Sequence, residues 1–135
     1  MRQIALLVLM ASLAGCATLG RPSPCGTDQF PATMQTLYFG TQRAEAPAVA
    51  QPDWLQFLEH SVTPAFPDGL TWWQAKGQWR DRDGELVEET TFILQVLQRD
   101  APEEAAKADS LITTYKKQFA QKSVLSTRQR ICASF

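Results

Sequence analysis

The feature that most constrains the fold is a pair of long alternating segments joined by a tight turn. The first segment, residues 70–80, carries small and aromatic side chains at every second position on one face: Trp73, Ala75, Gly77 and Trp79. The second, residues 86–97, ends in a strongly apolar run, and residues 81–84 (Asp-Arg-Asp-Gly) supply a turn of the Asp-Gly kind between them. The pattern predicts two long strands paired as an antiparallel hairpin.

Two amphipathic helices flank this hairpin in the sequence. The first is predicted to begin at Asp53, which can cap a helix together with Gln56, and to stop within a residue or two of Pro64. The second is predicted to begin at Asp100, with Pro102 tolerated in its first turn. The buried stripe of the second helix recurs at steps of three and four residues: Ala105, Ala108, Ile112, Tyr115 and Phe119.

Two further strands complete the pattern. Residues 34–40 alternate and are rich in aromatic side chains, and residues 123–135 form a last strand. The element order is therefore β-α-β-β-α-β, which predicts an α+β fold of the ferredoxin-like kind, with one antiparallel sheet and two helices on one face. In that topology the last strand lies antiparallel beside the first.

The N-terminus has the composition of an export signal. Arg2 gives a short positive start, and the apolar run that follows is too short for a transmembrane span, which needs about 20 residues. Ala14 and Gly15 then precede Cys16, an arrangement that resembles the lipobox of bacterial lipoproteins. We therefore predict that residues 1–15 are a removed lipoprotein signal peptide and that Cys16 carries the lipid. The alternative is an ordinary secreted protein with a chance cysteine.

The predicted lipid on Cys16 indicates the membrane with which the protein is associated. Two or three acyl chains on Cys16, palmitate among them, would hold the protein stably on a membrane. Ala17 stands where an aspartate commonly retains lipoproteins of Gram-negative bacteria in the inner membrane, so we expect the outer membrane, facing the periplasm. Residues 16–33 contain many small residues, prolines and glycines and are predicted to be a flexible tether. Residues 34–135 are predicted to form a single α+β domain.

The numbers of cysteine, histidine and charged residues limit which bonds, metal sites and partners we expect. Cys16 is assigned to lipid, and an oxidising compartment favours a disulfide between Cys25 and Cys132; two free thiols are the alternative. His60 is the only histidine and no paired ligand spacing exists, so we expect no metal site, and we expect no cofactor. The chain has 13 basic and 14 acidic residues and no basic surface pattern, so nucleic acid is not an expected partner.

Two sets of side chains are candidates for ligand binding. Gln78 and Arg80 point the same way on one strand, with Lys76 beside them, and could form a donor-rich patch for a carboxylate or phosphate. Alternatively, Arg80 pairs with carboxylates across the hairpin. Tyr38, Tyr115 and Lys116 could line a pocket between sheet and helix, or the tyrosines could be core residues whose hydroxyls reach a partner. The four tryptophans are either core or an aromatic face for binding.

Several short motifs, in this order, are similar to one known family. They are Leu37-Tyr38-Phe39-Gly40, Phe66-Pro67-Asp68-Gly69-Leu70-Thr71, Gly77-Gln78-Trp79-Arg80, Tyr115-Lys116 with Phe119, and Ser123-Val124-Leu125. The pattern resembles the domain-of-unknown-function family numbered 3574, a group of small bacterial exported proteins and lipoproteins, over residues 34–135. Trp72-Trp73 departs from it, because smaller apolar residues are expected there. The resemblance implies the domain boundaries and the fold, but no established activity and no catalytic residues.

Two functions remain open. We expect a non-catalytic cell-envelope lipoprotein whose domain binds an envelope protein or a small ligand and which could form a homodimer through its sheet. The alternative is a small cofactor-independent enzyme with Tyr38, Arg80 and Tyr115 in a pocket between the sheet and the helices. A closed apolar pocket holding all three would favour the enzyme, whereas Arg80 salt-bridged on the surface would favour the binding module.

Overall fold

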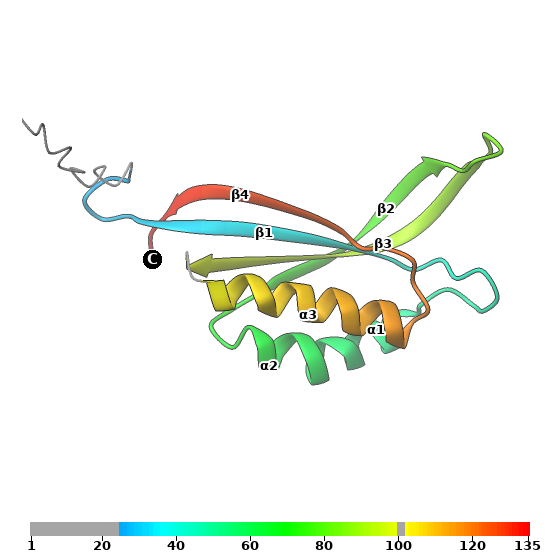
Figure 1. Ribbon diagram of the computed structural model, residues 1–135, viewed down its shortest axis with the longest axis horizontal. Helices are drawn as coiled ribbons and strands as arrows, with labels where there is room; N and C mark the ends of the chain where they lie inside the picture. Colours follow the sequence, from blue (N-terminus) through cyan, green and yellow to red (C-terminus); the bar gives the residue numbers. More distant parts are fainter. Residues whose placement is uncertain (1–24, 100–101) are drawn as a thin grey trace, which may run out of the picture.

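The computed structural model describes residues 25–99 and 102–135. It contains one four-stranded antiparallel sheet with helices against one face (Figure 1). The strands are β1 (Phe30–Gly40), β2 (Thr71–Arg80), β3 (Leu86–Arg99) and β4 (Leu125–Ala133). The helices are α1 (Gln51–Phe57), a π-helical turn (Leu58–Val62), α2 (Thr63–Ala65) and α3 (Pro102–Gln118). The predicted signal peptide, the lipid-bearing Cys16 and the Asp100 cap lie outside the described residues.

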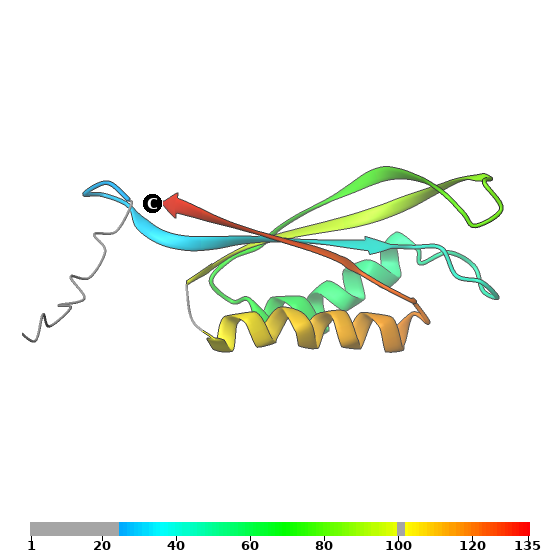
Figure 2. The ribbon, with the colours of Figure 1, turned by 45° about the horizontal axis from the view of Figure 1, so that its top comes forward.

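The sheet has the strand order β2-β3-β1-β4, and every neighbouring pair is antiparallel. The hairpin predicted from the Asp-Gly turn is β2–β3, with Arg80 opposite Leu86. As predicted, β4 lies antiparallel beside β1. Figure 2 shows the helices on the same side of the sheet, so the predicted α+β class with one antiparallel sheet is confirmed. No helix within the described residues is long and apolar enough to cross a membrane.

The connection from β1 to β2 includes one helical stretch that runs from α1 through the π-helical turn to α2. Pro52 lies in its first turn, where a missing N–H costs nothing. The prediction that Asp53 is the N-cap is wrong, because the helix begins earlier, at Gln51. The Asp53 carboxylate instead accepts a hydrogen bond from the Ala50 N–H at 3.2 Å. The stretch ends at Ala65, as the nearby proline predicted.

The first strand begins earlier than the sequence predicts. Residues 16–33 are expected to be a tether and residue 34 to open the domain, but β1 starts at Phe30. At this end β1 pairs with β4 alone and Pro31 lies opposite Cys132, so a proline without an N–H is tolerated. The predicted Cys25–Cys132 disulfide is confirmed, with Cα atoms 5.5 Å apart. It ties the segment before β1 to the end of β4.

The core lies between the sheet and the helices and is largely aromatic. Trp54 on α1 is fully buried and stacks on Phe92 of β3, with ring centroids 4.9 Å apart. Phe39, Phe57 and Tyr115 pack around this pair from β1, α1 and α3. Because rings from two helices and two strands meet here, they hold the helical layer on the sheet.

The four tryptophans divide between the two faces of the sheet. Trp54 and the half-buried Trp72 contact each other in the core, with ring centroids 6.0 Å apart. Side chains alternate along a strand, so Trp73 and Trp79 point to the other face, where they are 40% and 50% exposed. We call this the open face; it is formed by the even-numbered residues of β1 and the odd-numbered residues of β2, β3 and β4.

Candidate functional site

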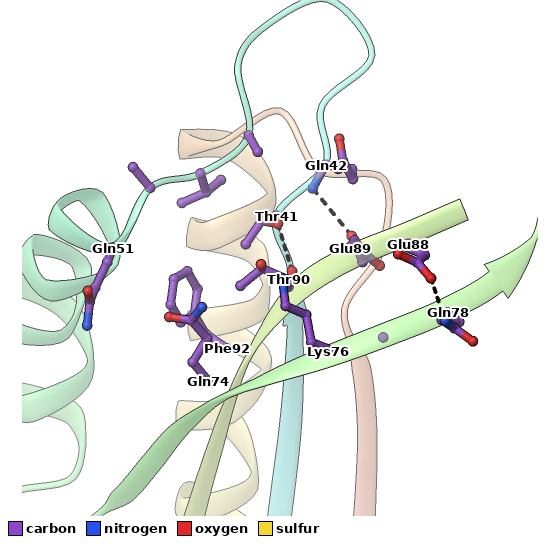
Figure 3. A pocket seen from close by; sticks show the side chains of 14 residues that line it. Thr41, Gln42, Gln51, Gln74, Lys76, Gln78, Glu88, Glu89, Thr90 and Phe92 are labelled. Atoms are coloured by element: carbon purple, nitrogen blue, oxygen red, sulfur yellow. Dashed lines mark hydrogen bonds between the residues drawn. The ribbon is translucent and has the colours of Figure 1, made fainter. Parts of the chain in front are cut away.

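The β2–β3 hairpin extends beyond the helices (Figures 1 and 2). A cleft lies at this end of the sheet. Its volume is about 740 Å³, and its walls are the hairpin, the loop of residues 41–50 and the start of α1 (Figure 3). The long polar side chains around it are Gln51, Gln74, Lys76, Gln78, Glu88 and Glu89. The cleft is therefore concave and predominantly polar.

The loop of residues 41–50 is attached to the fold at both ends. The hydroxyl of the buried Thr41 donates a hydrogen bond to the Thr90 carbonyl on β3 at 2.7 Å. At the other end, the Val49 N–H donates to the Thr41 carbonyl at 2.9 Å, which closes the loop on itself. Because the Val49 side chain is buried in the core, this wall of the cleft is anchored.

Strand β2 supplies the opposite wall, because alternation turns every second side chain the same way. Gln74, Lys76 and Gln78 come from this set (Figure 3). The Gln78 amide donates to the Glu88 carboxylate at 2.6 Å, so these two side chains are paired with each other. In the part of the chain that the structure describes, the Lys76 ammonium and the Gln74 amide have no hydrogen-bond or ion-pair partner. Their donors and acceptors are available to a ligand.

Glu89 lies at the rim of the cleft beside two glycines. Its Oε2 accepts a hydrogen bond from the Gln42 N–H at 3.3 Å. A Cβ atom at Gly40 would lie 2.9 Å from that oxygen, and one at Gly77 would lie 3.2 Å from the Thr91 hydroxyl. A side chain at Gly40 would displace the Glu89 carboxylate, and one at Gly77 would crowd Thr91. The absence of a side chain at both glycines therefore leaves room for Glu89 in its observed position.

Tyr115, a predicted site residue, belongs to the core. It is fully buried on α3, its ring lies 4.6 Å from that of Phe39, and its hydroxyl donates to the Gly40 carbonyl at 3.0 Å. Burial, with the negative charge of Glu89 as a smaller cause, raises the pKa of Tyr115 well above its ordinary value. The alternative interpretation, a core tyrosine whose hydroxyl reaches a partner, describes the observed contacts.

Replacing Tyr115 with phenylalanine is expected to flatten the alkaline pH dependence of stability. The folded chain keeps the phenolic proton above pH 10.0, where the unfolded chain releases it. The stability that this raised pKa contributes is therefore complete below pH 10.0 and is lost as the pH rises toward the folded-state value. In urea unfolding, the free energy of unfolding of the wild type should fall faster above that pH than that of Tyr115→Phe, by up to about 1.4 kcal/mol per pH unit. Parallel pH profiles would contradict this role.

The other predicted ligand residues are not brought together. Tyr38 lies on the open face, on the far side of the sheet from the cleft. Arg80 is exposed and donates to the Gly84 carbonyl within the hairpin turn at 2.8 Å, not to a carboxylate across the strands. Lys116 is exposed on α3. Only Gln78 lies in the cleft, so the set proposed for an enzyme pocket is not assembled.

The sequence predicts one wall of the cleft but not the others. The alternation of β2 places Gln74, Lys76 and Gln78 on one face, and all three line the cleft. Gln51 and the loop of residues 41–50 gave no comparable signal, because a loop's path depends on tertiary contacts such as Thr41 to Thr90. Within residues 25–99 and 102–135, no group of three or more His, Cys, Asp or Glu side chains could hold a metal ion.

Two solved structures resemble this fold. One is a phage SAM lyase in complex with S-methyl-5'-thioadenosine, with a TM-score of 0.58 and 14% identity, covering 84% of this chain and 95% of that chain. The other is a phage SAM lyase in its apo state, with a TM-score of 0.53 and 15% identity, covering 78% of this chain and 90% of that one. At such low identity the likeness shows the fold alone.

The family assignment comes from the sequence. A comparison with curated proteins finds no match. The model of the family described as a protein of unknown function (DUF3574) matches residues 34–135, from within β1 to the last residue. That span contains every helix and strand described above except the first residues of β1, and all the motifs that carried the resemblance. The chain therefore belongs to the DUF3574 family of proteins of unknown function.

Proposed function

We propose that this chain is a non-catalytic, lipid-anchored envelope protein whose domain binds a small polar molecule in the cleft. The observation that carries the proposal is the pair of Lys76 and Gln74, which face the cleft with no partner among the described residues. Convergent polar groups in a concave site are the usual mark of a small-molecule site. The anchored loop of residues 41–50 supports the same interpretation, because it forms the cleft before any ligand arrives.

The charges around the cleft limit the class of ligand. Lys76 contributes one positive charge, and Glu88 and Glu89 contribute two negative ones, so a multiply charged anion such as phosphate would be repelled. Amide side chains donate and accept equally, which suits an uncharged molecule rich in hydrogen-bonding groups. A nucleoside is such a molecule, and the phage SAM lyase of similar fold is described in complex with one, S-methyl-5'-thioadenosine. That nucleoside is therefore the first probe to use.

Calorimetric titration with S-methyl-5'-thioadenosine should give saturable binding that depends on Lys76. Replacing Lys76 with methionine keeps the stem of the side chain and removes its donors, and we expect affinity to fall about tenfold. The matched control is Lys116→Met, an exposed lysine on α3 outside the cleft, which should leave affinity unchanged. Equal affinities for the wild type and Lys76→Met would contradict the assigned site.

The enzyme alternative is tested in the same titration with SAM as the ligand. The structure does not gather Tyr38, Arg80 and Tyr115, which supports a binding role. We expect chromatography after incubation to recover the SAM unchanged. Enzyme-dependent release of S-methyl-5'-thioadenosine from SAM would contradict the non-catalytic role and would indicate a lyase.

The lipid anchor and the envelope location belong to the same proposal. The leader pattern of residues 1–15 ends directly before Cys16, and the Cys25–Cys132 disulfide fits an oxidising compartment such as the periplasm. The disulfide also engages the other two of the three cysteines, which leaves Cys16 for palmitate and diacylglycerol. The position of β4 beside β1 supports a ferredoxin-like assignment of the sheet.

Replacing Cys16 with serine should release the protein from membranes. Fractionation of bacteria that express the wild type should place it with the outer membrane, and labelled palmitate should be incorporated. The serine variant should take up no label and should fractionate with the periplasm, since the domain offers no other anchor in this account. A serine variant that still sediments with membranes would contradict the anchor.

A further inference from the structure

The open face of the sheet carries an apolar row that crosses every strand. An antiparallel sheet with one solvated face normally places polar side chains on that face. Here a single cross-strand row runs through all four strands on the open face: Trp73, Ile93, Tyr38 and Leu125. Trp73 is 40% exposed and Leu125 is 60% exposed, while Ile93, between Trp73 and Tyr38, is 8% exposed. The next row along the strands is polar and consists of Thr71, Gln95, Thr36 and Thr127. Contiguous apolar surface of this kind on a single copy marks an interaction site.

Most charged residues of the strands lie on the helix side of the sheet. Those that alternation places on the helix side are Lys76, Arg80, Glu88, Arg128 and Arg130. Among the described strand residues of the open face, only Glu89 and Arg99 are charged, and both belong to β3. Glu89 also reaches the rim of the cleft, where it accepts the Gln42 N–H, and the Arg99 guanidinium lies 4.9 Å from the centroid of the Phe30 ring. Lys76, Arg80 and Glu88 are exposed, so their charges reach water on the helix side.

From the apolar row and the two charges of β3 we infer that the open face binds a second copy of this chain, face to face. Glu89 and Arg99 lie on the same strand about 33 Å apart, at about 3.3 Å per residue. A two-fold axis between the sheets, perpendicular to the strands and level with Leu94, sets β3 of one copy against β3 of the other in the opposite direction. Arg99 of each copy then lies toward Glu89 of the partner subunit, and the contact occurs twice.

This charge arrangement selects a second copy as the occupant. An acid and a base at opposite ends of one strand complement themselves under a two-fold axis without any further partner. The row of Trp73, Ile93 and Tyr38 then lies next to the axis, at the centre of the interface. Aromatic residues at the centre and charges at the edges are the usual anatomy of a protein–protein interface.

The area of the open face is sufficient for a stable dimer. Strands about nine residues long span about 30 Å, and four strands about 4.8 Å apart span about 19 Å. The face therefore covers about 600 Å², so two copies would bury about 1,200 Å² in total, which reaches the lower end of specific interfaces. The helix side, by contrast, is already occupied by α1, α2 and α3.

Sedimentation equilibrium of the exported chain carrying Cys16→Ser tests this inference without lipid in the measurement. We expect a monomer–dimer equilibrium, and we expect Trp73→Asp to weaken it about 30-fold or more, as central aromatic residues do. The matched control is Leu86→Asp, a similarly exposed apolar residue of the same hairpin on the helix side, which should dimerise like the wild type. Circular dichroism shows whether each variant is folded.

A charge exchange tests the two-fold arrangement itself. Glu89→Lys and Arg99→Glu should each weaken the dimer, because each places like charges together, and the double variant should recover most of the lost affinity. A chain that stays monomeric at all concentrations, a larger oligomer, or a folded Trp73→Asp variant with wild-type affinity would overturn the inference. The inference would also be overturned if the double variant lost as much dimer affinity as the two single variants lose together. None of these results depends on whether the cleft binds a nucleoside.

Discussion

Replacing Trp54 with alanine is expected to lower the free energy of unfolding by about 3–5 kcal/mol, the range for large aromatic residues in a core. The indole is fully buried and contacts rings from the sheet and both helical segments, including Phe92 and Tyr115. Its Nε1 has no hydrogen-bond partner among the described residues, so deleting the ring also removes an unsatisfied buried donor. This second effect predicts that Trp54→Phe is much milder than Trp54→Ala.

The measurement is urea unfolding of both variants beside a matched control on the same helix. Leu55 follows Trp54 in α1 but is 46% exposed, so Leu55→Ala should change the free energy of unfolding by no more than about 0.5 kcal/mol. A loss below about 1 kcal/mol for Trp54→Ala would contradict a core centred on this residue.

Removing the disulfide is expected to lower the free energy of unfolding by about 2–5 kcal/mol. The bond joins residues 107 apart in the sequence, so it restricts the unfolded chain strongly. It also acts on the weakest part of the sheet. β4 is an edge strand that pairs with β1 alone, and most of its side chains are exposed. Without the bond, the end of β4 near Cys132 should open first.

The double variant Cys25→Ser, Cys132→Ser removes the bond without leaving an odd thiol. Urea unfolding should show the loss of stability, and amide hydrogen exchange should show faster exchange in β4 than in β3, the central strand beside β1. The control is the wild type in reductant, which should behave like the double variant. Equal urea midpoints for the oxidised and reduced wild type would contradict a stabilising role for the bond.

Much of the fold was predictable because its signals are local. Alternation and the Asp-Gly turn defined β2 and β3, and the three- and four-residue spacing that includes Ala108 and Phe119 defined the buried face of α3. The disulfide was predicted from the even number of remaining cysteines and from an expected oxidising compartment. Each of these signals depends on residues close in sequence or on a simple count, so the tertiary structure did not have to be known first.

The errors fall where tertiary contacts override local patterns. The start of β1 at Phe30 was missed because a Pro- and Gly-rich segment looks like a tether until β4 pairs with it. The start of α1 was misplaced by Asp53, whose carboxylate supports the first turn from inside the helix. Local propensity is a weak guide at such positions, since pairing partners decide the outcome.

The candidate site was the least predictable part. Gln78 was placed correctly because its orientation follows from the period of the strand. Tyr38 and Tyr115 were grouped together, but strand alternation directs Tyr38 to the open face, while Tyr115 reaches the Gly40 carbonyl from the helix side. Which face of a sheet the helices cover is set by the whole topology, so a single sequence could not separate the two tyrosines.

Binding of a small polar molecule in the cleft is tested most directly by a two-dimensional amide NMR titration of the chain carrying Cys16→Ser with S-methyl-5'-thioadenosine. Saturable shifts are expected only in residues 41–51, 74–78 and 88–90, which form the walls of the cleft. Lys76→Met should require about tenfold more ligand for the same shifts. The absence of shifts at saturating nucleoside, or shifts centred on Trp73 and Tyr38 of the open face, would contradict the proposed site.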